Sequence, residues 1–172
     1  MRDVAPEAAI ALRAEQGPDA SLVEGLVGRA FGPGRYAKAA ERLREHNRPL
    51  LDLSIVAWAG GEAVGCVRLW PIAIGAAPAL LLGPFAVESG WRSLGLGAAL
   101  IAKACERAGA AGHGLILLVG DEAYFGPLGF SAAPAGRVVM PGPVDQRRVL
   151  VRGLAPAAAD HLEGPVAPAP GA

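Results

Sequence analysis

The sequence is poor in the residues that bind metals or form disulfides. It has two cysteines and three histidines among 172 residues. Cys66 falls on an expected strand and Cys105 on an apolar helix face, so both are predicted to be small core residues rather than a disulfide or a metal pair. His46, His113 and His161 lack metal-ligand spacing, and we therefore expect no metal site.

An excess of charge of one sign is also absent. Sixteen basic residues balance sixteen acidic ones, and the formal net charge is zero. Without a broad basic field, neither nucleic acid nor an anionic membrane surface is an expected partner. No apolar run reaches transmembrane length and the N-terminus has no signal-peptide pattern, so we expect a cytoplasmic protein.

Aromatic residues are scarce, at 5%, although the hydrophobic fraction is 52% and contains much alanine. A chain of this length is large enough to bury a substantial core, and residues 1–172 are predicted to form one domain. The Pro/Ala/Gly-rich end, residues 164–172, is expected to be irregular.

Hydrophobic periodicity and turn signals predict an α+β layout. Helices are expected from residue 19 or 21 to 31, over 36–46 and over 96–110. Strands are expected over 9–14, 53–59, 63–70, 80–87, 115–119, 138–141 and 148–152, with a Gly-Gly turn between the second and third. A helix between consecutive strands implies a parallel pair for 80–87 and 115–119, whereas 138–141 and 148–152 are expected to pair antiparallel.

The segment over residues 91–119, WRSLGLGAALIAKACERAGAAGHGLILLV, contains the most informative local pattern. Gly95 and Gly97 stand where an apolar-periodic helix begins, and no acidic residue lies in its first turn. The first N–H groups of such a helix have no intrahelical partner, and the helix dipole favours negative charge there. Glycine lets a ligand approach that backbone closely. The pattern therefore predicts an anion cradle, for phosphate.

Other interpretations of these glycines compete with the cradle. A plain loop-to-helix junction can carry the same two glycines. A dinucleotide fingerprint needs a third small residue where Leu100 stands, and an acidic partner about 20 residues on. Asp121 follows the next strand too closely to be that partner. A P-loop needs Gly-Lys-Ser/Thr, which the sequence lacks. The pattern that remains is Arg92-x-x-Gly95-x-Gly97.

This Arg-x-x-Gly-x-Gly pattern resembles the pyrophosphate loop of the GNAT superfamily of acyl-CoA-dependent N-acetyltransferases. The order of parts around it is also similar, namely Phe85-Ala86-Val87 ending a strand, the loop, a helix, the strand over 115–119, the aromatic pair Tyr124-Phe125, and Gly129-Phe130. The resemblance is strongest over residues 80–130. It implies a GNAT-like α+β fold, with a central mixed, largely antiparallel sheet flanked by helices and a splayed parallel pair formed by 80–87 and 115–119.

Gly83-Pro84 falls inside the strand over 80–87, and proline cannot donate to a ladder. The strand can simply lie at a sheet edge, but the resemblance implies a bulge that opens a wedge beside its parallel neighbour. Free backbone groups in the wedge would pair with the pantetheine arm of acetyl-CoA, almost as an added strand. The residues expected to bind acetyl-CoA on this basis are Phe85, Ala86, Val87, Arg92, Ser93, Leu94, Gly95, Leu96, Gly97, Ala98 and Phe125.

The resemblance also implies the chemistry, in which a neutral amine attacks the thioester directly. The backbone N–H of Val87 is expected to stabilise the tetrahedral oxyanion. Glu88 is the first candidate for the base, although strand neighbours alternate faces and it can equally be a solvated strand-end glutamate. The family's Tyr-x-x-x-Gly-Phe places a phenol to protonate the thiolate, but Phe125 stands at that position here. Its neighbour Tyr124 is therefore the candidate acid, with a water as the alternative.

The acceptor is implied to be a small-molecule or protein amine, bound by the segments before residue 50. Cations in that stretch stand alongside Glu41 and Glu45 and can form a solvated helix face, or Arg35 or Arg48 can attract an acidic acceptor or the cofactor's 3′-phosphate. They are Arg35, Lys38, Arg42, Arg44 and Arg48. Arg68 and Trp70 can face the same pocket, though Trp70 can equally be core.

Two functions of different class stay open, and the residue that separates them is Phe125. The first is an N-acetyltransferase that uses acetyl-CoA, either as a monomer or as a homodimer. The second is a CoA-binding sensor that keeps the phosphate cradle but has lost turnover.

Overall fold

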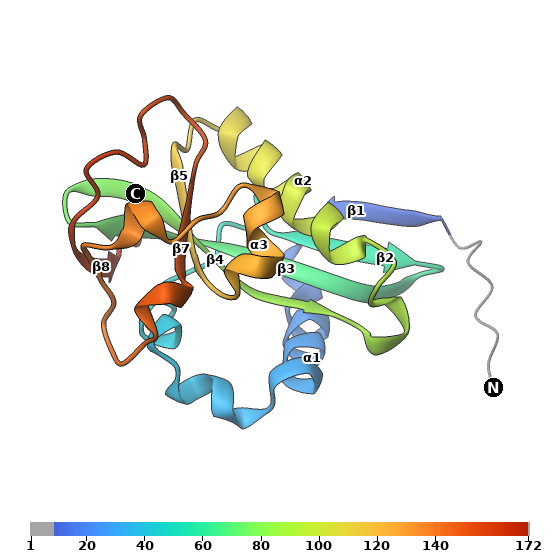
Figure 1. Cartoon of the computed structure of the whole chain (residues 1–172). Helices are drawn as coiled ribbons and strands as arrows, with labels where there is room; N and C mark the ends of the chain where they lie inside the picture. Colours follow the sequence, from blue (N-terminus) through green and yellow to red (C-terminus); the bar gives the residue numbers. More distant parts are fainter. Residues whose placement is uncertain (1–8, 172) are drawn as a thin grey trace.

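A computed structural model describes residues 9–171, which build a mixed sheet with helices on both faces (Figure 1). Six of the eight strands follow the order β1-β2-β3-β4-β5-β7, while β8 pairs with both β3 and β6. The strands are β1 (Ile10–Ala14), β2 (Ile55–Ala59), β3 (Glu62–Ile74), β4 (Ala77–Val87), β5 (Leu115–Val119), β6 (Val138–Val139), β7 (Val149–Gly153) and β8 (Gly164–Pro168). The predicted α+β class, with a mixed and largely antiparallel sheet, is confirmed.

Strands β1 to β4 are antiparallel neighbours, and the two turns that join β2 to β3 and β3 to β4 depend on glycine. Gly60 and Gly61 have φ angles of 56° and 83° and turn β2 back into β3. Such left-handed angles are typical of the two-residue hairpin turn that a Gly-Gly pair predicts. Gly75, with a φ of 55°, turns β3 into β4. A side chain there would collide with the Glu163 carbonyl, so the position also needs glycine for space.

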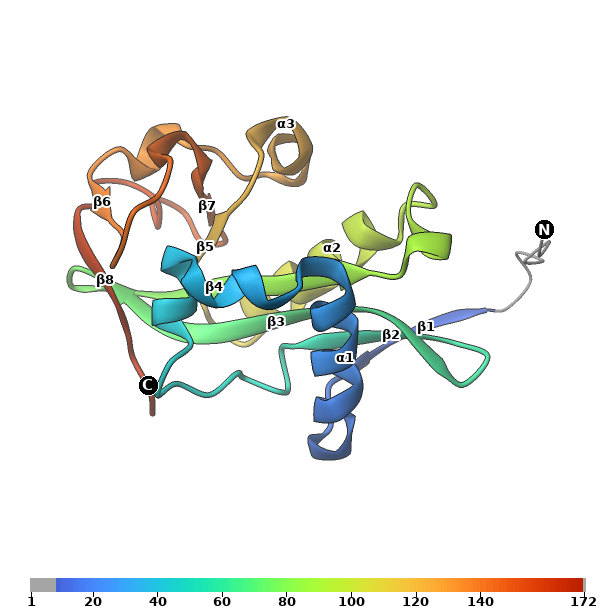
Figure 2. The same ribbon diagram turned by 90° about the horizontal axis from the view of Figure 1, so that it is seen from below.

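The two main helices cover opposite faces of the sheet (Figures 1 and 2). On one face lies α2 (Leu96–Ala110), whose buried residues Leu96, Leu100, Ile101, Ala104, Cys105 and Ala108 are those that the periodicity predicts. On the other face lies α1 (Ala20–Phe31), which packs Val23 and Val27 against Cys66 and Ala86. Because strand neighbours alternate faces, each strand contributes to both layers of core.

Residues 36–46 do not form the single α-helix that their composition predicts. They lie in two short 3₁₀ helices, η2 (Pro33–Ala37) and η3 (Ala39–Leu43), and in the turn that follows. Lys38 is extended between the two, with a ψ of 147°. This break lets Ala39 and Leu43 reach the core on the sheet. Tertiary packing therefore overrides the helix propensity of the Ala, Glu, Arg and Leu residues here.

The predicted antiparallel pair of 138–141 with 148–152 is wrong. Instead β7 pairs antiparallel with β5, and β6 pairs parallel with β8. The side of β5 away from β4 is free to accept a strand, and the apolar run at the start of β7 suits a strand buried on both faces.

The end of the chain is also more regular than its composition predicts. Strand β8 pairs with β3 over Ile72–Ile74 and buries Val166. Its prolines stand at position two and at the last position of this short strand, where a missing N–H disturbs the ladder least. Burial of a single valine and the edge of β3 thus order a segment that turn-forming residues dominate.

The sheet forks between β4 and β5. These parallel strands pair only at Leu80↔Ile116 and Leu81↔Leu117. Beyond that point β4 stays paired with β3, while β5 stays paired with β7. Gly83-Pro84 lies just past the last pair, next to a shift in the register between β3 and β4. The splayed parallel pair is therefore present, and proline stands where β4 loses its partner.

Candidate active site

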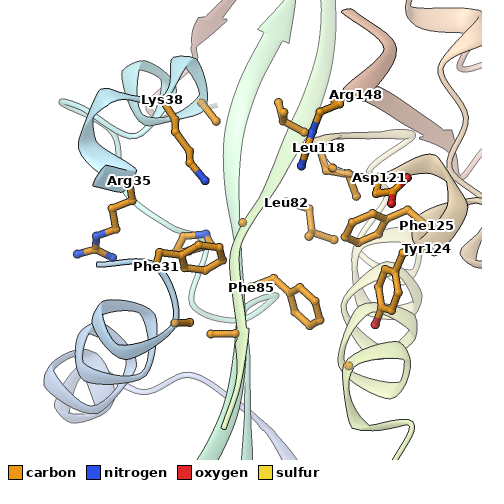
Figure 3. A pocket seen from close by; sticks show the side chains of 18 of the residues that line it. Phe31, Arg35, Lys38, Leu82, Phe85, Leu118, Asp121, Tyr124, Phe125 and Arg148 are labelled. Atoms are coloured by element: carbon orange, nitrogen blue, oxygen red, sulfur yellow. The ribbon is translucent and has the colours of Figure 1, made fainter. Parts of the chain in front are cut away.

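The fork opens into a cleft of about 810 Å³ that β4 crosses (Figure 3). On one side lie the loop before α2, the end of β5 and α3 (Glu122–Phe125), which we call the α2 wall. On the other side lie the end of α1 and the helices η2 and η3, which we call the α1 wall. The segment before β7 touches η3 through Gly142 and Ala39 and closes one end of the cleft.

The free edge of β4 faces the cleft with its backbone groups. The N–H of Glu88 donates to Val64 O of β3 at 2.9 Å. Successive backbone groups of a strand point to alternate edges, so the N–H and C=O of Val87 and of Phe85 point away from β3. There they meet the space that β5 has left. Arg92 Nε donates to the Val87 carbonyl at 3.1 Å, while the Val87 N–H faces the cleft.

The first turn of α2 presents unpartnered N–H groups at the same cleft. The first intrahelical bond runs from the Ala99 N–H to Gly95 O at 3.1 Å, so the N–H groups of Leu96, Gly97 and Ala98 have no partner within the helix. No side chain caps this end and no acidic residue lies in the first turn. Gly95 has a φ of 78°, which favours glycine. The arrangement suits an anion.

The predicted cofactor residues divide into two groups by position. Those that line the cleft are Phe85, Ala86, Val87, Arg92, Ser93, Gly97 and Phe125. The others, Leu94, Gly95, Leu96 and Ala98, are not among the lining residues. The Leu96 side chain is buried in the core and Leu94 is 64% exposed, so any contribution of these two to an anion site is through their main chain.

Glu88, the candidate base, directly follows β4, and its side chain is directed toward α1. It shares that direction with Ala86 and pairs with Arg29 of α1, whose Nε donates to its Oε1 at 2.8 Å. It borders a separate groove near Trp58 and Trp91 and is not among the residues of the large cleft. The alternation of strand faces explains this position, so the structure does not favour Glu88 as the base.

Four aromatic rings gather where α3 meets β4. Phe125 packs edge-on to Phe85, Tyr124 and Phe130, with ring centroids 6.3, 4.8 and 6.1 Å away. Its ring fills the space beside Gly120, where a Cβ would collide with it. The Tyr124 hydroxyl lies over Gly97, at 2.6 Å from where a Cβ would stand. Gly97 is thus needed for the aromatic contact as well as for the cradle.

The α1 wall is charged. Arg35, Lys38 and Arg44 line it, and Arg148 reaches the cleft from the segment that closes its end (Figure 3). Arg35 pairs with Glu24 at 2.8 Å and Arg44 with Glu41 at 2.9 Å. Arg48, which the sequence also suggests, is not among the lining residues.

The sequence of residues 23–124, more than half of the chain, matches the acetyltransferase (GNAT) family. The chain belongs to the GNAT family of acetyltransferases. No curated protein matches the sequence significantly.

Solved GNAT structures share the whole fold. The N-acetyltransferase YhbS of Escherichia coli, in complex with CoA, is 24% identical, with 98% of this chain and 94% of that chain covered and a TM-score of 0.81. A GNAT acetyltransferase of Brucella melitensis, in complex with acetyl-CoA, is also 24% identical, with 94% and 96% covered and a TM-score of 0.68. At this identity the likeness establishes the GNAT fold.

Within this GNAT fold the two residues around the family's tyrosine position have different surroundings. Phe125 packs against the main core under α2, whereas Tyr124 is 46% exposed and lines the cleft with its hydroxyl at the cradle. Burial raises the pKa of Tyr124 above its ordinary value. The phenol of the cleft is therefore displaced by one residue and holds its proton tightly.

A buried ion network supports the α1 wall, and sequence patterns did not predict it. Arg68 of β3 is 6% exposed and bonds both oxygens of Glu15, at 3.0 and 2.7 Å, and Glu24 at 2.8 Å. Glu24 in turn accepts from Arg35. The sequence does show a single arginine, Arg68, in an apolar strand, which indicates a buried charge. It does not identify the partner, because Glu15 is 53 positions away.

Trp70 and the cysteines belong to the core rather than to the site. Trp70 Nε1 donates to the Gly83 carbonyl at 2.6 Å, which pins β4 at the fork. Burial raises the pKa of the Cys66 thiol to about 12, and burial also raises that of Cys105. Thiols that hold their protons so tightly are weak nucleophiles.

Across residues 9–171, His, Cys, Asp and Glu side chains form no group of three or more that could hold a metal ion. In the same part of the chain, no helix has both the length and the apolar character needed to cross a membrane.

Proposed function

We propose that this chain transfers the acetyl group of acetyl-CoA to an amine, by direct attack within a ternary complex. The observation that carries the proposal is the fork, which exposes the edge of β4 beside the first turn of α2. The amides of a pantetheine arm can pair with such an edge, and a pyrophosphate has the charge that this turn attracts. Membership of the GNAT family supports the same assignment.

Each part of the cofactor has a matching part of the cleft. The N–H groups of Leu96, Gly97 and Ala98 receive the pyrophosphate, with Arg92 beside them. The edge groups of Phe85 pair with the pantetheine arm, since they face the gap. The Phe85 and Phe125 rings supply the apolar contact for its methylene groups.

The Val87 N–H stabilises the oxyanion in this mechanism. It points into the cleft at the end of β4, and the Arg92 bond to the carbonyl of the same residue fixes the strand there. A fixed donor of this kind contributes about 10²–10³ in rate when it meets the developing charge. The tetrahedral intermediate loses the extra proton of its amine nitrogen to water, collapses, expels the CoA thiolate and leaves an amide.

The amine enters in its neutral form. Glu88 is turned away, and the carboxylates that line the cleft are Asp121 and Asp145. Hydrogen bonds from Arg147 lower the pKa of Asp145, which makes it a weak base. Asp121 caps α3 by accepting the Ala123 N–H. The rate should therefore rise with pH up to the pKa of the acceptor amine, about 10.4 for a lysine-like amine.

Tyr124 can protonate the departing thiolate, but with a small effect. Its pKa is raised above an ordinary value of 10.0, whereas a thiol such as CoA titrates near ~8.5. Proton transfer from the phenol to the thiolate is then uphill, and the thiolate leaves at neutral pH with little help. Tyr124 contributes more as part of the wall over Gly97 than as an acid.

A second candidate function is a CoA-binding sensor without turnover. The observation that favours it is Phe125, which leaves the family's acid position with no proton to donate. The two functions share the cradle and differ only in the amine-dependent release of CoA.

The test measures binding and turnover separately on the purified full chain. Calorimetry with acetyl-CoA should give a one-to-one complex, and a thiol reagent should detect CoA release that depends on added amine. Release with at least one amine class supports the transferase. Intact binding without amine-dependent release across amino acids, polyamines, aminoglycosides and peptides would favour the sensor.

A further inference from the structure

One end of the cleft holds two cations without an acidic partner. Lys38 and Arg148 line the cleft from different elements, and Figure 3 shows both side chains directed toward the space between them. Among residues 9–171, neither takes part in an ion pair with a carboxylate. Their charges are therefore available to a ligand.

The surroundings of this pair are positive as well. Arg44 lies on the same wall, and its Nε is buried with no hydrogen-bond partner. Burial lowers the pKa of Arg44, Glu41 offsets this only in part, and the nearby charges of Arg35 and Arg68 lower it further. Burial is the main cause of that lowering, and Arg35 and Arg68, which contribute a smaller part, are each paired with a carboxylate.

Two carboxylates line the cleft, and both have other hydrogen-bond partners. Asp145 accepts from Arg147 at 3.1 and 2.9 Å and also feels the charge of Arg148, while Asp121 accepts from the Ala123 N–H. Phe31 adds an apolar surface, 44% exposed, with the Lys38 Nζ 5.3 Å from its ring centre. An anion with a short apolar body would meet both kinds of surface.

We propose that the acceptor is an amine that also carries a carboxylate, and that Lys38 and Arg148 bind the carboxylate. This inference rests on the proposed transfer to an amine and names the class of acceptor. The carboxylate docks at the α1 wall, so the amine at its other end is directed toward the thioester beside Val87. A polyamine or another purely cationic acceptor would be repelled at the same place.

The cofactor is the other source of anions, but its cradle lies elsewhere. The N–H groups that suit a pyrophosphate belong to α2, on the opposite wall, where Gly97 lies under Tyr124. Figure 3 places Tyr124 and Phe85 toward one end of the cleft, and Lys38 and Arg148 toward the other. The two anions are thus assigned to separate parts of the cleft.

The test compares amino acids with their amides as acceptors at equal concentrations of neutral amine, because replacing the carboxylate with an amide also lowers the amine pKa. We expect kcat/KM to favour the carboxylate by about tenfold or more, as charge-assisted hydrogen bonds usually do. Lys38→Glu and Arg148→Glu should each abolish or reverse this preference and leave acetyl-CoA affinity within about twofold. Arg13→Glu makes the same change from a positive to a negative charge at an exposed position of β1. It is the matched control and should keep the preference.

The preference for a carboxylate can also be measured without turnover. The experiment compares the affinities of N-acetyl amino acids and N-acetyl amino-acid amides for the complex of the protein with CoA. Preferential binding of the carboxylate that depends on Lys38 supports the inference even if no amine is acetylated, and then only the transferase fails. Equal binding, or better turnover of the amides, overturns it and leaves the transferase standing. A third outcome would also overturn the inference. If Lys38→Glu binds acetyl-CoA more weakly but binds its 3′-dephospho form normally, the cations bind the 3′-phosphate of the cofactor instead of the acceptor.

Discussion

The two walls of the cleft bind by different means. The α2 wall offers main-chain N–H groups and the edge of β4, whereas the α1 wall offers long cationic side chains held by Glu24 and Glu41. Main-chain groups keep their positions when side chains change, but side chains can be exchanged without refolding the wall. If the proposed assignment holds, the cofactor and the acceptor are recognised by parts of the molecule that can vary independently.

The most severe way to break the α1 wall lies beneath it, at Arg68. Arg68→Met leaves Glu15, which is 3% exposed, as a buried charge without its partner. We expect the free energy of unfolding in urea to fall by about 3–5 kcal/mol. Arg147→Met removes an exposed ion pair with Asp145 and should change stability little.

A double variant checks the cause of that loss. Glu15→Leu combined with Arg68→Met removes both buried charges, and much of the lost stability should return. If the double variant is as unstable as Arg68→Met alone, the loss comes from packing around Arg68 rather than from the unpaired carboxylate.

The α2 wall should be broken most strongly at Gly97. Gly97→Asp places a carboxylate in the first turn of α2, and acetyl-CoA affinity should fall by about 100-fold or more. For the parent chain, ligand at 100 times Kd should add about 2.7 kcal/mol of stability, measured as a shift in thermal unfolding, and the variant should lose that shift.

Two variants separate charge from crowding in that experiment. Gly97→Ala meets the Tyr124 hydroxyl and the Phe85 ring without adding charge, and it should weaken binding less than the aspartate. Gly109→Asp adds the same charge at an open position of α2 and should bind normally. Equal losses in Gly97→Ala and Gly97→Asp would mean that the aromatic contact, not the anion cradle, is what Gly97 maintains.

Smaller effects on turnover are expected at Phe125 and Tyr124, the two candidate positions for an acid on the α2 wall. Phe125→Tyr should raise kcat by less than about 100-fold, with little change in acetyl-CoA affinity, because the thiolate already leaves readily. Tyr124→Phe should lower kcat by less than about tenfold, because burial raises the pKa of Tyr124. A larger loss in Tyr124→Phe would make Tyr124 the working acid, and Phe125→Tyr should then do little.

The smallest effect is expected at Glu88. Glu88→Gln removes the charge that pairs with Arg29 of α1, and kcat/KM should change by less than about threefold. A general base typically contributes about 10²–10⁴, so a loss of that size would restore Glu88 as the base.

Local patterns predicted the α2 wall well. The 3.6-residue period identified the buried face of α2, from Leu100 to Ala108, and the glycines marked its N-terminus. The proline of β4 pointed to a sheet edge or a bulge, and the resemblance to the GNAT superfamily implied the fork. These features depend on residues a few positions apart, which is the range over which spacing constrains structure. The reason that Gly97 must be small was still hidden, because Tyr124 reaches it from another helix.

The α1 wall could not be predicted in the same way. The Arg68–Glu15 pair joins residues 53 positions apart, and no spacing rule connects them. The run over 36–46 has the composition of a helix, yet the core contacts of Leu43 dictate a 3₁₀ turn instead. The cations of this stretch were visible in the sequence, but which of them face the cleft depends on where η2 and η3 end.

The short strand β8 has a mechanical consequence. The chain leaves β7 on one arm of the forked sheet and returns through β8 to β3 on the other arm, so it ties the two arms together like a strap. The strap also contacts η3, although none of its residues lines the cleft. This segment therefore helps to set the distance between the two walls from outside the cleft. A change in its length would alter the width of the acceptor site without changing any residue that lines it.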